Sequence, residues 1–333
     1  MKKYVVCVSI VCVILVFAMN IAAEEKSVSY PTLKVNGYIH TNYTIDKDGG
    51  NNFQAKRARG KFSGNACQNV SYSLLFDFID DKKGSNLAVA YVAVNLLPQV
   101  TLKMGQFKTP FSMEYLTSST KGDTIELAQV VNKLGSKRDI GIQFSGDISP
   151  LLGYAVGVFN GTGSNASEEN KRKDIVARGI IKPAKGILLG VSHYEGWSGT
   201  EEEENITKRR TGAQLGFDKE SLSLKGEFIF GKNNETSAYG WYGQVGYMLP
   251  VCSSKKMQPI IKYDSYDPNS DKEEDKTDIA TIGLNFFMTK NTKLQLNNQI
   301  ILNEGFSVDN SLPYTFYSTR LKATGISISW LRK

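Results

Sequence analysis

The feature that most constrains the fold of this chain is a period-two alternation of apolar and polar residues that recurs along most of its length. In residues 33–45, for example, Val35 and Ile39 alternate with Asn36 and His40, so one face of the extended segment is apolar and the other is polar. Such alternation predicts β-strands with one face in an apolar medium and one face in water. Sixteen segments carry the pattern: 33–45, 53–64, 70–79, 86–96, 100–108, 139–148, 152–161, 173–182, 186–195, 208–218, 222–231, 238–249, 257–267, 277–288, 291–302 and 319–331.

The connections between these segments alternate between short and long. The short ones are "NACQN", "LPQ", "SPL", "PAK", "DKES", "PVCSSKK" and "TK", whereas the long ones are polar, charged or glycine-rich, such as "GTGSNASEENKR", "GWSGTEEEENIT" and "KNNETSA". An even number of strands of about ten residues, with short turns at one end and long loops at the other, is typical of outer-membrane β-barrels. We therefore predict an all-β fold, a 16-stranded antiparallel transmembrane β-barrel. A secreted β-sandwich is the alternative, but it would not separate its connections in this way.

The N-terminus has the features of a secretory signal peptide, which we assign to residues 1–23. Two lysines precede an apolar run that ends near Ala18, and a short segment then leads to the charged "EEK". We expect cleavage near Ala23, which leaves residues 24–333 as the barrel domain. An uncleaved membrane anchor is the alternative.

The mature chain is basic and retains two cysteines. The signal peptide removes two lysines and no acid from a formal net charge of +7, so the excess of positive charge persists outside the cytoplasm. An exported basic protein meets no genome, and its partner is therefore expected to be a small anion or a membrane surface rather than nucleic acid. Cys67 and Cys252 fall in different predicted turns, and we expect them to be unpaired.

Four cations lie close together in "FQAKRARGKFSG", residues 53–64. Arg57, Arg59 and Lys61 share one face of this strand, whereas small and aromatic residues occupy the other. A cation on the lipid face costs about 2–4 kcal/mol at the bilayer midplane, so these three side chains are expected to point into the lumen. The same alternation places Lys56 on the outer face, near the rim.

The parity of the other strands assigns further charged residues to the lumen. The cations are Lys103, Arg178, Arg210 and Lys225, and the acids assigned most clearly are Asp77, Glu227 and Asp264. An excess of cations inside low-dielectric walls attracts anions and repels cations, which predicts an anion pathway. The alternative is that these charges pair across strands and only stabilise the wall.

The connection from Thr109 to Arg138 is too long for a hairpin loop. Unstructured loops of about thirty residues are uncommon unless they are functional, and this one would constrict the pore if it folded inward. The cations expected at the constriction are Lys121, Lys133, Lys137 and Arg138; three acids, Glu114, Asp123 and Glu126, lie among them. A plain surface loop is the alternative.

Four stretches resemble one known family. "FQAKRARGKFSG" is similar to an early strand of that family, "LKMGQFKTPFSMEYLTSS" to the strand that leads into its constriction loop, and "KRDIGIQFSG" and "YAVGVFNGTG" to the strands that follow. The family is that of the phosphate-selective porins O and P. The resemblance implies an anion-conducting barrel that is usually trimeric. By position, it assigns Lys56, Arg57 and Arg59 to the basic run and Gln106 to Glu114 to the loop entrance.

These features together predict a channel of the Gram-negative outer membrane for the passive diffusion of small anions, such as phosphate or another oxyanion. Its expected partners are the diffusing anions, the membrane lipid and two further copies of the chain; no cofactor is expected. The alternative is a general diffusion porin with little solute specificity. An outer-membrane enzyme is disfavoured because neither histidine, His40 or His193, belongs to a serine-hydrolase motif, and no metal-binding or phosphate-loop motif occurs.

Overall fold

The computed structural model describes residues 29–45, 50–79, 86–135, 137–168, 170–198, 206–252, 255–303 and 318–324. The predicted signal peptide and the end of the last predicted strand lie outside these residues.

Most of the described chain is β-strand. The strands are β1 (Lys34–Ile45), β2 (Asn51–Cys67), β3 (Val70–Asp77), β4 (Leu87–Leu97), β5 (Val100–Lys108), β6 (Arg138–Ser149), β7 (Leu152–Phe159), β8 (Asp174–Ile181), β9 (Ile187–Ser198), β10 (Ile206–Lys219), β11 (Leu222–Asn233), β12 (Thr236–Tyr247), β13 (Leu249–Cys252), β14 (Lys255–Asp267), β15 (Thr277–Thr289), β16 (Thr292–Asn303) and β17 (Ser318–Thr324). Two short helices, α2 (Met113–Leu116) and α3 (Gln129–Lys133), lie between β5 and β6. Among the described residues, no helix is long and apolar enough to cross a membrane.

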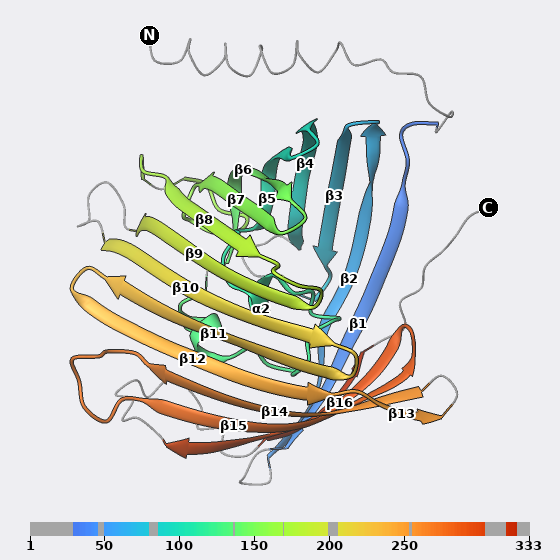
Figure 1. Ribbon diagram of the computed structural model, residues 1–333, viewed down its shortest axis with the longest axis vertical. Helices are drawn as coiled ribbons and strands as arrows, with labels where there is room; N and C mark the ends of the chain where they lie inside the picture. The colour runs from blue at the N-terminus through green and yellow to red at the C-terminus, as the bar shows by residue number, and fades with distance from the viewer. Residues whose placement is uncertain are drawn as a thin grey trace.

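Each strand pairs in antiparallel fashion with its neighbours along the chain, and β1 also pairs with β17 (Figure 1). β12 and β13 both pair with β14, so they occupy one position in the sheet, and the strands fill sixteen positions. The predicted 16-stranded antiparallel barrel is therefore confirmed. One connection differs from the prediction: "KNNETSA" was expected to form a long loop, but β11 and β12 extend into it and leave a two-residue turn.

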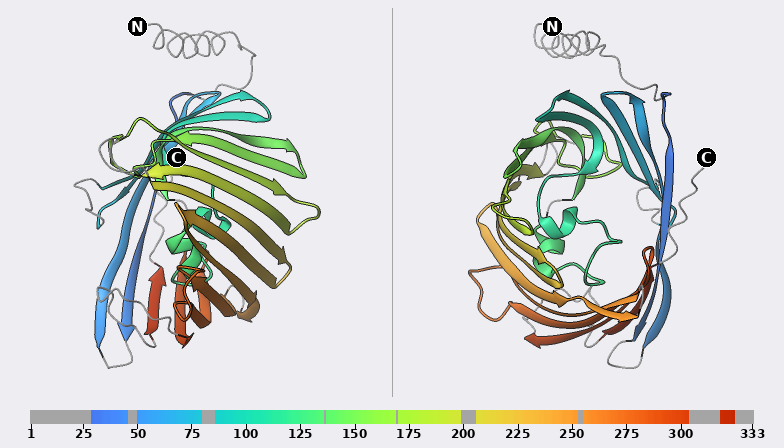
Figure 2. Two further views of the ribbon diagram at one scale, coloured as in Figure 1. Left: turned by 90° about the vertical axis from the view of Figure 1, so that its left-hand side faces the viewer. Right: turned by 45° about the vertical axis from the view of Figure 1, so that its right-hand side comes forward.

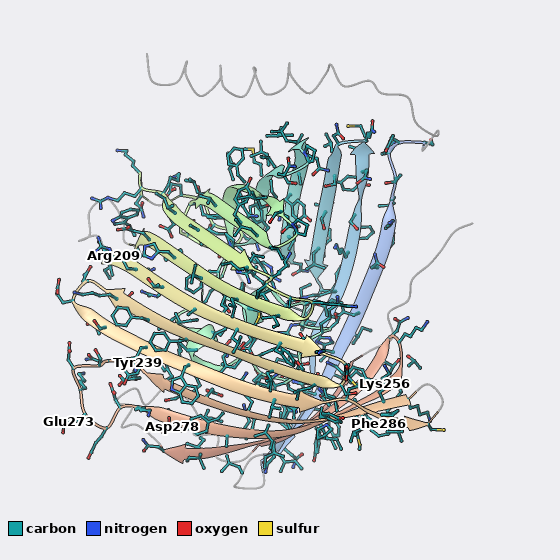
Figure 3. The ribbon with its side chains drawn as sticks, viewed as in Figure 1. Arg209, Tyr239, Lys256, Glu273, Asp278 and Phe286 are labelled. Atoms are coloured by element: carbon teal, nitrogen blue, oxygen red, sulfur yellow. The ribbon has the colours of Figure 1, made fainter. Side chains whose placement is uncertain are left out.

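The polarity of the wall is the reverse of that in a water-soluble protein. Apolar side chains such as Val191, Ile261 and Met104 are about 60% exposed on the outside, whereas Gln214 and Asn285 are almost fully buried on the inside. Figure 3 draws the side chains on both faces of the strands. Apolar surface in contact with lipid and polar surface in contact with a lumen explain this arrangement.

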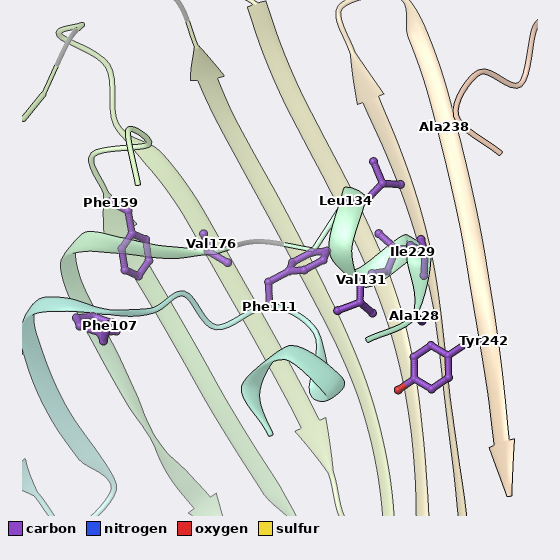
Figure 4. Packing of buried hydrophobic residues seen from close by; sticks show 11 residues of the cluster. Phe107, Phe111, Ala128, Val131, Leu134, Phe159, Val176, Ile229, Ala238 and Tyr242 are labelled. Carbon is purple, nitrogen blue, oxygen red and sulfur yellow. The ribbon is translucent and has the colours of Figure 1, made fainter. Parts of the chain in front are cut away.

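The connection between β5 and β6 folds into the interior of the barrel, where Figure 2 shows both of its helices enclosed by the ring of strands. We call residues 109–137 the inner loop. Its apolar side chains, among them Phe111, Val131 and Leu134, are buried against Val176 and Ile229 of the wall (Figure 4).

Glycines in the wall allow the inner loop to approach closely. A Cβ atom at Gly240 in β12 would lie 2.6 Å from the carbonyl oxygen of Ser265 in β14 and 2.8 Å from Cβ of Val130, and one at Gly212 in β10 would lie 3.4 Å from the ring of Phe111. A larger residue at Gly240 would therefore clash with both β14 and α3.

A β-bulge changes the facing of one predicted residue. His40 pairs with Arg57, but the next residue of β1, Thr41, pairs with Ala55, so Lys56 is the extra residue of β2. Lys56 therefore points inward, where it forms an ion pair with Glu126 of the inner loop. Its predicted place on the outer face was wrong because strict alternation does not continue through a bulge.

Candidate functional site

The inner loop is fixed to the wall by the buried carboxylate of Glu227 in β11. This carboxylate accepts hydrogen bonds from the backbone N–H groups of Met113 (2.9 Å) and Glu114 (2.6 Å) at the start of α2. It also accepts hydrogen bonds from the hydroxyls of Ser112 (3.2 Å) and Tyr242 (3.0 Å). Only 3% of Glu227 is exposed, so these four donors replace the water that a carboxylate requires.

Lysines of the wall bind the acids of the inner loop. Lys262 in β14 donates to Glu114 at 2.6 Å, and Lys225 in β11 donates to Asp123 at 2.6 Å. Lys293 in β16 donates to the carbonyl oxygen of Gly122 at 2.6 Å. The acids of the loop are thus matched by cations that hold it in place.

The inner loop also contacts the first two strands of the barrel. The hydroxyl of Tyr38 in β1 lies 2.8 Å from that of Ser119, and Glu126 pairs with Lys56 of β2. The loop is therefore bonded to β1 and β2 and to β11, β12, β14, β15 and β16. Because β2 and β11 lie on nearly opposite sides of the ring of strands, the loop spans the lumen.

A central cavity lies between the inner loop and the wall. Its charged lining residues are the cations Arg57, Arg59, Lys108, Arg138 and Lys225 and the acids Glu114 and Asp123. The hydroxyl residues Tyr115, Thr117, Ser118 and Ser119 also line it. Burial raises the pKa of the Tyr115 phenol, so its hydroxyl group stays neutral at physiological pH.

Three cations of the central cavity have no acidic partner. Within the described part of the chain, no carboxylate lies within ion-pair distance of Arg57, Lys108 or Arg138. Lys108 donates to the backbone carbonyls of Tyr115 and Thr117. Arg59 differs, because its Nε donates to Asp77 at 2.7 Å. We call Arg57, Lys108 and Arg138 the unpaired triad.

Two further cavities lie in the barrel. The turn-side cavity is lined by Lys61, Lys121, Lys290 and Lys293 and by no carboxylate of the described chain. The loop-side cavity is lined by Lys133, Lys137, Arg138, Lys208 and Arg210, with Asp139 as its acid. The four cations predicted at a single constriction are therefore distributed over separate cavities: Lys121 lies in the turn-side cavity, Lys133 and Lys137 lie in the loop-side cavity, and Arg138 lines both the loop-side and the central cavity.

The remaining predicted lumenal cations are held by neighbours. The ammonium group of Lys103 lies 5.0 Å from the ring centres of both Tyr91 and Phe107. Arg178 donates to Oε1 of Gln214, at 2.7 Å from Nη2. Arg210 donates to the side chain of Asn233 at 2.6 Å. Of the seven predicted lumenal cations, the central cavity thus brings together Arg57, Arg59 and Lys225.

Sequence reasoning did not single out Lys108, Lys262 and Lys293. Asp264 was predicted to face the lumen, and Lys262 lies two residues before it in the same strand. Residues two apart in a strand face the same side, so alternation alone was sufficient to find Lys262. Lys108 ends the strand before the inner loop, and only the path of that loop places it beside Arg138. The described residues contain no group of His, Cys, Asp or Glu side chains arranged to hold a metal ion.

Comparison with known proteins gives one family. The model of the family described as phosphate-selective porin O and P matches residues 33–212 and 204–303, which is most of the chain. A search of curated protein sequences gives no significant match.

Several solved outer-membrane channels share the fold. The outer-membrane channel DcaP of Acinetobacter baumannii aligns with a TM-score of 0.66 at 14% identity, over 92% of this chain and 100% of that one. An anion-selective porin from Comamonas acidovorans aligns with a TM-score of 0.65 at 12% identity, over 89% and 99%. The trimer form of OmpT from Vibrio cholerae aligns with a TM-score of 0.61 at 9% identity, over 88% and 98%.

Proposed function

Because the chain belongs to the phosphate-selective porin O and P family, we propose that it conducts small anions through a constriction lined by arginine and lysine. Its family and fold point to a diffusion channel of the Gram-negative outer membrane, and an enzymatic role is not proposed.

The excess of cations over acids in the central cavity supports anion selectivity most strongly. Five cations face two acids there, and wall lysines already bind both acids, Glu114 and Asp123. The positive charge of the unpaired triad therefore remains available to a passing anion. Low-dielectric walls concentrate this potential along the lumen, which raises the local concentration of anions.

The cavities suggest how an anion passes without being trapped. The loop-side, central and turn-side cavities each present several cations rather than one enclosed site. Conduction requires sites that attract an ion but release it, and staggered cations meet this condition. In this proposal, an anion exchanges between cations and moves down its gradient without any chemical step.

Oxyanions such as phosphate are the proposed preferred solutes. The guanidinium groups of Arg57 and Arg138 can each donate two parallel hydrogen bonds to an oxyanion, and Ser118, Ser119 and Tyr115 add neutral donors nearby. We further propose an exported mature chain that begins after residue 23 and assembles as a homotrimer, as the trimer form of the structurally similar OmpT suggests.

The proposed preference can be tested by solute uptake into liposomes that contain the purified protein. We expect anionic solutes to enter faster than neutral solutes of equal size, and cationic solutes to enter slowest. We also expect inorganic phosphate to reduce chloride current through single channels. Equal uptake of all three solute classes would contradict anion selectivity, whereas selective uptake without block by phosphate would indicate a porin that does not prefer oxyanions.

A further inference from the structure

Three side chains form a hydrogen-bonded row across the inner face of β1, β2 and β3. In the register of these strands, Tyr38 lies opposite Arg59, and Arg59 lies opposite Asp77. Nε of Arg59 donates to the carboxylate of Asp77 at 2.7 Å, and Nη1 of Arg59 donates to the phenol oxygen of Tyr38 at 2.8 Å. We call Tyr38, Arg59 and Asp77 the cross-strand row.

The cross-strand row fixes the orientation of a hydroxyl group that faces the inner loop. Only 12% of the Arg59 side chain and 4% of the Asp77 side chain are exposed, so the charge-assisted bond between them is shielded from water. Because the phenol oxygen of Tyr38 accepts from Arg59, its own hydrogen is available to Oγ of Ser119, which lies 2.8 Å away. The row thus connects a buried acid of β3 to the inner loop.

The row meets the inner loop at a tight turn, Ser118–Lys121. A backbone hydrogen bond of 2.8 Å between the two ends of this segment closes the turn. The carbonyl groups that flank it, those of Thr117 and Gly122, accept hydrogen bonds from lysines of the wall. Among the residues that the structure describes, the hydroxyl of Tyr38 is the one wall group hydrogen-bonded to the turn itself.

The turn lies where two of the cavities meet. Ser119 lines the central cavity, Thr120 and Lys121 line the turn-side cavity, and Ser118 lines both. A solute that moves between these two cavities therefore passes beside the turn. The position of the turn limits the width of this passage.

We infer that the cross-strand row holds the turn in place and thereby sets the upper size of the solutes that pass between the central and turn-side cavities. Arg59 is a positioning residue: its guanidinium is engaged by Asp77 and Tyr38, and it acts on the inner loop through Tyr38. Arg57 lies two residues earlier and lines the same cavity without an acidic partner in the described chain. Two arginines of one strand face thus have different roles.

Uptake of neutral sugars into liposomes tests this role, because a size limit acts on any solute and does not depend on the proposed anion selectivity. Tyr38→Phe removes the bond to Ser119 but keeps the net charge and the ring. We expect uptake of a trisaccharide relative to a pentose to rise about fivefold, since one neutral hydrogen bond shifts an equilibrium by roughly that factor. Asp77→Asn should raise the ratio in the same direction because Arg59 is then held less firmly.

The matched control is Tyr91→Phe, which removes the hydroxyl of another inward tyrosine of the wall. Within the described chain that hydroxyl forms no hydrogen bond, so the uptake ratio should equal that of the wild type. The double variant Y38F/D77N should not exceed Tyr38→Phe, because Asp77 acts on the turn through Tyr38.

Equal uptake ratios for Tyr38→Phe and the wild type would overturn this role of the row. A further increase from Asp77→Asn in the Tyr38→Phe background would overturn the assignment of Arg59. Heat-modifiable electrophoretic mobility verifies that each variant has folded. The reversal potential of Tyr38→Phe in a salt gradient should equal that of the wild type because no charge has changed.

Discussion

Replacement of Glu227 by alanine is expected to release the inner loop from the wall and to widen the pore. The substitution leaves two backbone N–H groups and two hydroxyls of this buried cluster without their acceptor. Loss of one member of a buried charged network costs about 3–5 kcal/mol, which weakens the attachment of a loop that otherwise relies on apolar packing and its remaining ion pairs. We expect single-channel conductance to rise and larger anions to pass.

The matched control for Glu227→Ala is Gln143→Ala. Gln143 is also a buried, inward residue of the wall, but no hydrogen bond joins its side chain to the inner-loop residues that the structure describes. Its replacement should leave the conductance near that of the wild type. If Glu227→Ala shows wild-type conductance and its inner loop resists proteases as well as that of the wild type, Glu227 does not hold the loop.

Neutralisation of the unpaired triad is expected to abolish anion selectivity. In the variant R57Q/K108Q/R138Q, the central cavity retains two cations and two acids. Each lost cation stabilises an adjacent monovalent anion by about 1 kcal/mol at the dielectric constant of water. Loss of all three removes about 3 kcal/mol of this stabilisation. Because about 1.4 kcal/mol changes an equilibrium constant tenfold, the preference for anions should fall roughly a hundredfold. Glutamine at position 108 can still donate to the loop carbonyls, which preserves the loop geometry.

The control for this variant is K185Q/K219Q/K256Q, which removes three exposed cations near the turns. Both variants have the same net charge, so a difference in their reversal potentials reports the position of the charge rather than its amount. If both variants remain as anion-selective as the wild type, selectivity does not depend on the central cavity.

Alternation and connection length were sufficient to predict the barrel because side-chain facing in a regular strand has a strict period of two. This local rule also predicted the inward facing of Arg57 and Arg59. It failed at Lys56 because a bulge inserts one residue into β2, and no residue near this position signals the bulge.

The contacts of the inner loop were beyond sequence reasoning because they join residues far apart along the chain. Glu114 meets Lys262, and Asp123 meets Lys225, through the path of a loop whose course no periodicity describes. Lys225 was expected in the anion pathway, but in the structure it binds the loop acid Asp123. The charge available to a solute is thus determined by which cations lack a partner, and that information exists only in the folded structure.

The reversal potential of the wild-type channel in a planar bilayer, across a gradient of potassium chloride, tests the central claim most directly. Chloride and hydrated potassium diffuse at similar rates in water, so the sign of the potential reports the selectivity of the pore. We predict the sign that corresponds to chloride permeating faster than potassium, as the cation excess of the central cavity requires. A potential of the opposite sign, or one near zero, would contradict the account.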